Sequence, residues 1–251
     1  MTGDPPAITI VHDDGQVLAV DKPAGLAVHR SKMVARDDSY LIDRLRQQVA
    51  GELFLVNRLD RATSGLVLVA RSREVAAELG RQLMARDVDK RYLAIVRGWP
   101  DDAGRIDYPL TVGGMKGERK PALTHWRRLA QVEVPIALGR YPQQRYSLLE
   151  LVPETGRYRQ LRRHLHHIHH PIIGDTTLGR GEHNRLFREH FSCQRMLLHA
   201  WQLVLTHPAS GQTLALTAPP DATWHALLQR FGWQQALAGA AAPATAPTIP
   251  P

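Results

Sequence analysis

The strongest structural signal in this sequence is "LVLVA" at residues 66–70, a run in which every residue is apolar. A strand with one face in water alternates apolar and polar residues, whereas a strand covered on both faces is apolar throughout. We therefore expect residues 66–70 to form a central strand of a sheet, with other parts of the chain packed against both of its faces.

Hairpins are predicted near both ends of the chain. Between residues 7 and 25, two apolar runs flank the turn residues "DDG", a pattern typical of a hairpin. Residues 197–219 show the same pattern about "PASG". Further strands are predicted at 53–56, 91–98 and 145–153.

Helices are interspersed with these strands, and they are predicted at 40–49, 72–88, 158–168 and 222–233. The pattern weakens from 101 to 128, where residues 113–121 resemble a basic, glycine-rich loop. A regular strand–helix–strand repeat is absent, which argues against a doubly wound sheet. The sequence predicts an α+β protein with a large mixed or antiparallel sheet and helices packed on it.

One domain accounts for most of the chain. We expect it to span residues 8–233, preceded by an N-terminal extension at 1–7. From residue 234 to 251 the chain has no aromatic or charged residue and is rich in alanine and proline. Such a segment has little apolar surface to bury, so we expect a disordered tail.

The charge favours a polyanionic partner. The formal net charge is +8 and the sequence pI is near 10, which points to nucleic acid first. No stretch approaches the roughly 18–20 consecutive apolar residues of a membrane helix, and the first residues lack the features of a signal peptide. We expect a cytoplasmic protein without a membrane partner. A single cysteine, Cys193, excludes an internal disulfide and a cysteine-based zinc cage.

Asp60 is the first candidate for chemistry. It lies in "NRLDRATSG" (57–65), between two predicted strands, and Arg58 and Arg61 flank it. A carboxylate beside guanidinium groups stays ionised, which suits a nucleophile or a base better than a proton donor. The alternative is an ion pair that stabilises the loop. A pair of catalytic acids, as in glycosidases, is disfavoured because the segment holds no second carboxylate.

Two other segments combine basic residues with groups that could contact RNA. Tyr92 follows Lys90 and Arg91, so it could stack on an unpaired base, or it could be an ordinary strand tyrosine. The segment 157–170 carries four arginines and five histidines. A metal site is one interpretation of these histidines, but no carboxylate completes a set nearby and the arginines would repel a cation. A solvated basic face is the better interpretation.

Three stretches in this order resemble the signature stretches of the RluA-type pseudouridine synthases: "DKPAGLAVHR", "NRLDRATSGLVLVARS" and "GRYRQLRRHLHHIHHPIIGD". "KRYLAIVRG" matches the tyrosine strand of that family. The resemblance runs from about residue 8 to about residue 233. It implies the pseudouridine synthase fold with a central catalytic cleft, without the N-terminal S4 module of some relatives, because the first stretch already begins at Asp21.

The family converts uridine in RNA to pseudouridine by base flipping, and the resemblance assigns five roles. Asp60 matches the essential aspartate, and Arg162 matches the arginine that orients it. Arg58 matches the residue that holds the place of the extruded nucleotide. Tyr92 matches the tyrosine that stacks on the target base, and Leu161 matches an apolar contact in the same pocket. The reaction requires no cofactor and no metal.

Two departures from the family pattern adjoin these residues, because Asn57 and Arg159 stand where histidines are usual. "RYPQQRYSLLELVPETGR" and "HNRLFREHF" further resemble the TruC branch, which modifies the uridine at tRNA position 65. We expect a monomer with a tRNA substrate and no obligate protein partner. The alternatives are a synthase for ribosomal RNA, an RNA-binding protein without chemistry, and, least supported, a metal-dependent hydrolase.

Overall fold

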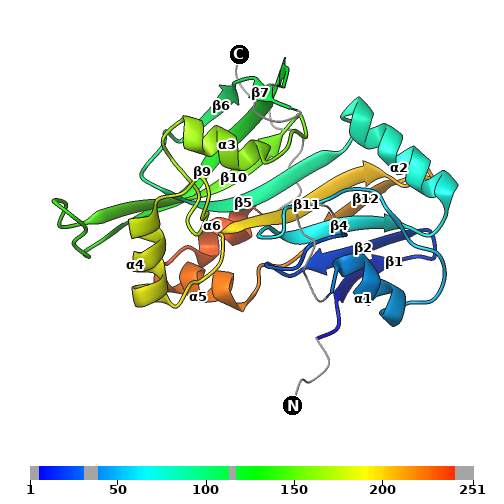
Figure 1. The fold of residues 1–251 in the computed structure, drawn as a ribbon, viewed down its shortest axis with the longest axis horizontal. Coiled ribbons are helices and arrows are strands. Elements are labelled where there is room, and N and C mark those ends of the chain that lie inside the picture. The colour runs from blue at the N-terminus through cyan, green and yellow to red at the C-terminus, as the bar shows by residue number, and fades with distance from the viewer. Residues whose placement is uncertain (1–5, 31–38, 113–116, 241–251) are drawn as a thin grey trace.

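The computed structural model describes residues 6–30, 39–112 and 117–240, and its main feature is one large sheet (Figure 1). The ten strands of this sheet are β1 (Thr9–Asp13), β2 (Val17–Lys22), β3 (Phe54–Leu55), β4 (Ser64–Ala70), β5 (Asp89–Arg97), β6 (Ala103–Asp107), β9 (Leu123–Val134), β10 (Gln144–Pro153), β11 (Leu198–Thr206) and β12 (Thr213–Thr217). A separate small sheet pairs β7 (Leu110–Thr111) with β8 (Arg119–Lys120).

The strands of the large sheet follow the order β1-β2-β4-β11-β5-β10-β9-β6, with β3 paired to β4 and β12 paired to β11. Among these described pairs, β4 and β11 run parallel and the others run antiparallel. The sheet is therefore mixed, and with its helices it forms the α+β architecture that the sequence predicts.

Six helices are described: α1 (Leu41–Gln48), α2 (Arg73–Ala85), α3 (Gln160–His167), α4 (Gly181–Phe191), α5 (Ala222–Arg230) and α6 (Gln234–Ala240). In Figure 1, α2 and α3 lie above the sheet, whereas α1, α4 and α5 lie below it. Helix α6 packs on the same core cluster as α4 and α5. Among the described residues, no helix has the length and apolar character needed to cross a membrane.

The core confirms the central strand expected at residues 66–70, because every residue of β4 is buried. Alternate side chains of β4 enter different clusters. Leu66 and Leu68 pack with Leu79 of α2, whereas Val67 packs with Leu41 of α1 on the other face. A strand that helices cover from both sides has no solvent face, which explains the unbroken apolar run.

The neighbouring strand β5 is covered in the same way. Ala94 belongs to the cluster that Leu165 of α3 enters, and Leu93 belongs to the cluster of Phe187 (α4) and Trp224 (α5). The helices at 40–49, 72–88, 158–168 and 222–233 and both terminal hairpins are thus confirmed, with shorter bounds. Ser72 caps α2 by accepting a hydrogen bond from the Val75 backbone.

Sequence reasoning missed six elements: β6, β7, β8, β9, α4 and α6. The edge strand β6 lies within the segment 101–128, where the pattern weakens, and the long strand β9 begins in it. Most of β9 is only half-buried, so its apolar alternation is weak. The loop predicted at 113–121 is wrong at its end, because Arg119–Lys120 pairs with β7; residues 113–116 lie outside the described part.

The boundary of the predicted disordered tail is also wrong. Residues 234–240 form helix α6, in which Ala240 is buried and Leu237 packs against the cluster around Trp233. Docking of these few apolar side chains on an existing core stabilises a segment whose composition alone indicates disorder. The rest of the predicted tail, 241–251, and the first five residues of the predicted extension lie outside the described residues.

The two halves of the sheet meet at a close contact between β4 and β11. Gly65 pairs with Ala200, and a Cβ at Gly65 would lie 2.1 Å from the Ala200 carbonyl oxygen. The φ angle of Gly65 is +107°, a conformation that favours glycine. This position therefore requires the glycine of "TSG", five residues after Asp60.

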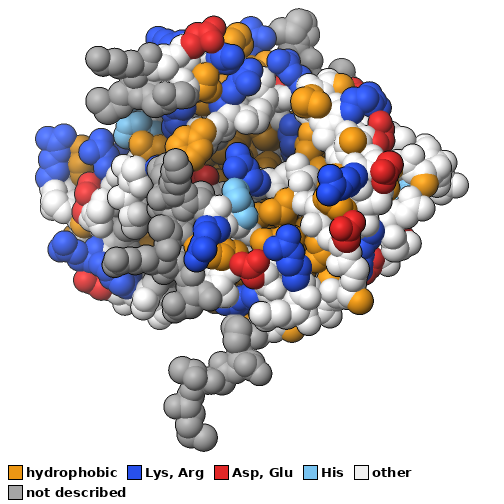
Figure 2. Space-filling model, turned by 45° about the vertical axis from the view of Figure 1, so that its right-hand side comes forward, with side chains coloured by type: hydrophobic (Ala, Val, Ile, Leu, Met, Phe, Trp, Pro, Cys, Tyr) orange, Lys and Arg blue, Asp and Glu red, His pale blue; other side chains and the backbone are white. Residues whose placement is uncertain are grey.

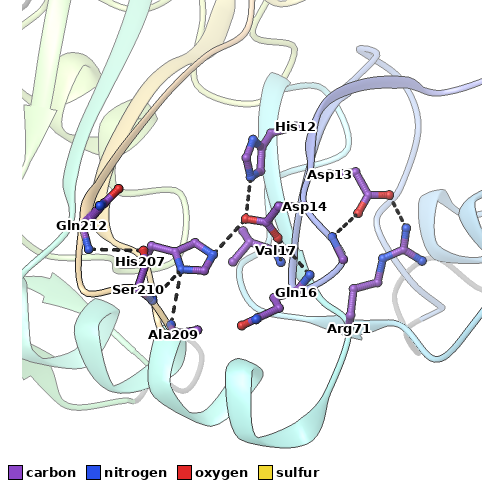
Figure 3. A network of polar contacts seen from close by, with 11 residues as sticks. His12, Asp13, Asp14, Gln16, Val17, Arg71, His207, Ala209, Ser210 and Gln212 are labelled. Atoms are coloured by element: carbon purple, nitrogen blue, oxygen red, sulfur yellow. Dashed lines mark hydrogen bonds and ion pairs between the residues drawn. The ribbon is translucent and has the colours of Figure 1, made fainter.

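A carboxylate joins the first and last hairpins of the sheet (Figure 3). Oδ2 of Asp14 lies 2.9 Å from Nε2 of His12 and 2.8 Å from Nε2 of His207, and Oδ1 accepts hydrogen bonds from the Gln16 and Val17 backbone. Partial burial acts to raise the pKa of Asp14, but the hydrogen bonds from Val17, His12, Gln16 and His207 outweigh it and hold the pKa well below its usual range.

We predict that Asp14→Asn lowers the free energy of unfolding at pH 7 by about 1 kcal/mol, since it weakens these hydrogen bonds. A depressed native pKa stabilises the fold above the unfolded pKa, near 4, and this contribution is lost as the pH falls further. Urea unfolding of both proteins at several pH values measures the difference, which should shrink below pH 4. A difference that is constant with pH would contradict the assignment.

Candidate active site

A groove crosses the face of the sheet that carries α2 and α3. It has a volume of about 990 Å³ and lies between the end of α2, at Met84 and Arg86, and the start of α3, at Arg159. A smaller cavity of about 150 Å³, called the inner cavity below because Leu161 and Leu198 help to line it, adjoins the groove, and Asp60, Tyr92 and other residues line both spaces. The site candidates of the sequence therefore lie together.

The loop between β3 and β4 carries Asp60 and is held by the turn after β2. The Gly25 backbone donates to the Arg61 carbonyl at 2.8 Å, and Nε of Arg61 donates to the Gly25 carbonyl at 2.8 Å. The fully buried Lys22 ammonium donates to three carbonyls, including that of Arg61 at 3.1 Å. These contacts fix the backbone on the C-terminal side of Asp60.

The partner of the Asp60 carboxylate is Arg162, and not the sequence neighbour Arg61. Nη1 of Arg162 donates to Oδ2 of Asp60 at 2.8 Å across 102 positions of sequence. No hydrogen bond joins Oδ1 of Asp60 to a described residue, and the side chain is 23% exposed. One oxygen is thus held in place while the carboxylate remains accessible from the cavity.

Asp175 is a second carboxylate on the same guanidinium. Arg162 donates to it from Nε at 2.6 Å and from Nη2 at 2.9 Å, and its side chain is 1% exposed. The Thr177 and Leu178 backbones also donate to Asp175. Three nitrogens of Arg162 are therefore shared between a buried carboxylate that is itself fixed and a partly exposed one.

These contacts keep the guanidinium charged. Burial acts to lower the pKa of Arg162, but its hydrogen bonds with Asp175 and Asp60 outweigh it and raise the pKa. Burial likewise acts to raise the pKa of Asp175, which the contacts with Arg162 and with the Leu178 and Thr177 backbones lower below its usual value. The buried Arg162–Asp175 pair is therefore a stable ion pair, and Asp60 contacts it from the cavity side.

Sequence reasoning missed Asp175, although the third signature stretch ends on it. Its signal is "GD" after the break that follows α3: Gly174 has a φ of +80° and a Cβ there would lie 2.0 Å from the Arg195 carbonyl. Asn184 of α4 fastens this turn by accepting from the Gly174 backbone and donating to the Asp175 carbonyl. A residue that needs such a turn to reach its partner is hard to find from spacing alone.

The remaining candidates line the inner cavity. Tyr92 is half-buried on β5, and Leu161, 7% exposed, lies in the first turn of α3. Burial and the nearby Asp60 carboxylate raise the pKa of Tyr92 to about 12, so its hydroxyl stays protonated. Arg58 is exposed and lines both spaces. An aromatic ring, an apolar side chain and a carboxylate thus face one cavity.

The two departures from the family pattern, Asn57 and Arg159, both lie beside the site. Oδ1 of Asn57 accepts from the Leu68 backbone at 2.7 Å, which ties the loop of Asp60 to β4. Arg159 precedes α3 with a φ of +52° and lines both the cavity and the groove. Both residues therefore contribute to the immediate surroundings of the site.

The basic segment around α3 is less solvated than the sequence predicts. Arg162 and His164 are buried, and His164 is hydrogen-bonded to Thr124 and to the Tyr108 carbonyl. His166 and His170 contact backbone carbonyls instead of one another. Within residues 6–30, 39–112 and 117–240, no group of three or more His, Cys, Asp or Glu side chains could hold a metal ion.

The groove is strongly basic. Seven arginine or lysine side chains and two carboxylates line it, and the face drawn in Figure 2 shows Lys and Arg side chains around its central hollow. A concave surface with an excess of positive charge attracts a polyanion and concentrates it near the site. A phosphate backbone fits this surface better than a neutral ligand does.

Comparison with known families gives one match over most of the candidate domain. The model of the RNA pseudouridylate synthase family matches residues 16–167, which include all described elements from β2 to α3. The matched residues contain Asp60, Tyr92 and Arg162.

Individual relatives agree with this match. The chain is 48% identical over 236 residues to tRNA pseudouridine synthase C of Pectobacterium carotovorum, which covers 90% of this chain and 63% of that protein. It thus spans less than two thirds of that relative. It is 44% identical over 239 residues to the protein of the same name from Vibrio cholerae, covering 92% of this chain and 98% of that one.

A solved structure also shares the fold. Human RNA pseudouridylate synthase domain containing 4 superposes with a TM-score of 0.69 at 25% identity, covering 89% of this chain and 93% of that chain. The fold expected from the signature stretches is therefore confirmed.

We predict unequal effects when the two partners of Arg162 are changed. Asp175→Asn should lower the free energy of unfolding by about 3 kcal/mol, because it removes a fully buried charge partner. Asp60→Asn should cost less than about 1 kcal/mol, because Asp60 is partly exposed and holds one nitrogen. Urea unfolding measures both. Glu150→Gln, which removes another buried partner of two arginines, is the control and should resemble Asp175→Asn.

Equal effects of Asp175→Asn and Asp60→Asn, or a larger effect of Asp60→Asn, would contradict the view that Asp175 anchors Arg162 while Asp60 remains accessible.

Proposed function

Because the chain belongs to the RNA pseudouridylate synthase family, we propose that it isomerises a uridine of tRNA to pseudouridine with Asp60 as the essential residue. The observation that carries this proposal is the Asp60–Arg162 pair, which fixes one carboxylate oxygen at the wall of an aromatic-lined cavity inside a basic groove. The reaction is inferred from family membership, and the Asp60 carboxylate of this pair is the group that we propose begins it.

In this reaction the bond between N1 of uracil and C1′ of ribose breaks, the base turns over, and C5 bonds to C1′. N1 gains a proton and C5 loses one, so the product is an isomer of the substrate. The Asp60 carboxylate could attack the sugar, attack the base or take a proton from the sugar. Each role needs the carboxylate to be held near the uridine, and the hydrogen bond from Arg162 fixes one of its oxygens.

The cavity can receive a base that has left its stack. The Tyr92 ring and the Leu161 side chain line it, and stacking on an aromatic side chain contributes about 1–3 kcal/mol per base. Extrusion of a paired base costs a few kcal/mol, so stacking of this size offsets much of it. This comparison supports base flipping as the route by which the uridine reaches Asp60.

We assign the target to uridine 65 of tRNA. Two relatives that are more than 40% identical to the chain over the aligned residues are named tRNA pseudouridine synthase C, and the TruC-like stretches point to the same branch. The seven cationic side chains of the groove suit the phosphates of a folded stem. The cytoplasmic location and the monomeric state remain predictions.

The direct test is Asp60→Asn with an unmodified tRNA transcript. The variant should fold and bind the transcript with an affinity within about threefold of the unchanged protein, yet form no pseudouridine when the digested RNA is analysed by mass spectrometry, because the amide cannot act as a nucleophile or base. Asp101→Asn, at an exposed aspartate outside the groove, is the control and should keep full activity.

Turnover by purified Asp60→Asn would exclude Asp60 as the essential group. A transcript whose uridine 65 is replaced by cytidine, with its pairing partner changed to match, should receive no pseudouridine. Modification of that transcript would overturn the assigned position and leave the chemistry intact.

A second prediction concerns Arg58, which we propose to fill the space that the flipped base vacates. Arg58→Ala should slow modification of folded tRNA at least tenfold more than modification of a short single-stranded fragment that carries the same uridine, because the fragment has no stacked pair to replace. Arg105→Ala, at an exposed arginine of β6 outside the groove, should leave both rates nearly unchanged. Equal losses on both RNAs would remove this role from Arg58.

A further inference from the structure

Tyr158 is an exposed aromatic side chain that the reaction above does not use. It is 56% exposed, and it lines the groove between the end of α2 and the start of α3. Four large hydrophobic side chains are exposed among the described residues, and two of them, Tyr158 and Met84, line this groove. Apolar surface left exposed inside a basic groove indicates a binding role.

The neighbouring residue Arg159 holds the ring of Tyr158 in place. The guanidinium carbon of Arg159 lies over the Tyr158 ring, 4.9 Å from the ring centre. Arg159 has a left-handed backbone with a φ of +52°, which is uncommon for a residue with a Cβ and is frequent at functional sites. With one ring face beneath Arg159, the exposed area of the ring belongs to its other face and its edge.

The position of Tyr158 separates it from the target base. Arg159 lines both the inner cavity and the outer groove, whereas Tyr158 lines the outer groove alone. Tyr92 and Leu161 already face the inner cavity, where the target uridine would sit. A base stacked on Tyr158 therefore belongs to a different nucleotide. This nucleotide lies in the groove, along the RNA strand that runs out from the inner cavity.

We propose that Tyr158 stacks on the base of a nucleotide adjacent to the target uridine, with Arg159 holding the ring from behind and contributing charge. Arg159 makes no ion pair with a described carboxylate, so its charge is available to RNA phosphate. A ring with a cation on one face and a base on the other combines the two interactions typical of single-stranded RNA recognition.

In this arrangement, Tyr158 holds the base next to the flipped uridine outside the RNA helix as well. Extrusion from a stem breaks the stacking of the target base on both sides, and a second platform restores the stacking of one adjacent base. The proposal rests on the proposed function for the identity of the RNA, and it adds a second stacking position to the one at Tyr92.

The experiment measures binding of the full chain to fluorescently labelled tRNA by titration. Tyr158→Ala should weaken binding about 5- to 150-fold, the loss expected for one stacked base. Tyr158→Phe should stay within about twofold, because a phenyl ring stacks as well. Tyr141→Ala is the matched control: Tyr141 is 52% exposed with the Arg140 guanidinium 5.0 Å from its ring centre, but it lies outside the groove.

A double-mutant cycle identifies the stacked base. The same titrations are repeated with tRNAs that carry an abasic nucleotide directly before or directly after the target uridine. At the stacked position, the losses from the abasic nucleotide and from Tyr158→Ala should not add, whereas at the other position they should add.

Three outcomes would overturn the proposal: unchanged binding by Tyr158→Ala, a Tyr158→Phe defect as large as that of Tyr158→Ala, or additive losses at both positions. Pseudouridine is assayed in the same samples. Tight binding by the unchanged protein without pseudouridine would contradict the proposed function, while the binding data would still decide the role of Tyr158.

Discussion

The Arg162 guanidinium joins the two parts of the chain that build the site. Asp60 comes from the loop before β4, Arg162 from α3, and Asp175 from the turn after α3. Because Asp175 holds two nitrogens of the guanidinium in a buried position, the third can hold Asp60 without closing the carboxylate off from the cavity. Asp175 thus fixes the position of the Arg162 guanidinium, and the guanidinium in turn binds Asp60.

The sheet supplies the rigid frame for this contact. Gly65 lets β4 approach β11 closely, which places the loop of Asp60 beside β5 and its Tyr92. Lys22 and Gly25 hold the same loop from the opposite side. A reactive group on a loop needs such support, since displacement by about 1 Å can lower a rate by about a hundredfold. The glycines and lysine of the signature stretches therefore act through backbone placement.

Sequence reasoning could predict what local patterns encode. The apolar run of β4, the capped helix α2 and the terminal hairpins each carry a complete signal within a few residues. The pairing of Asp60 with Arg162 came from the family resemblance, because nothing local joins residues 102 positions apart.

Other features depend on tertiary contacts. Asp175 reaches Arg162 through a left-handed glycine turn, β9 is only half-buried, and α6 is stabilised by docking on the core of the domain. The exposed ring of Tyr158 can be interpreted as a binding residue only because it lines the groove between α2 and α3. Local sequence patterns do not encode these tertiary contacts, so only the structure shows them.

The most direct measurement of the central claim is pseudouridine mapping of total RNA from cells that lack this protein, with the gene for the unchanged protein or for Asp60→Asn returned to them. The account predicts that one tRNA pseudouridine, at position 65, disappears on deletion, returns with the unchanged protein and stays absent with Asp60→Asn. Return of the modification with Asp60→Asn would contradict the role of the Asp60–Arg162 pair, and loss of a pseudouridine from ribosomal RNA instead would contradict the tRNA target.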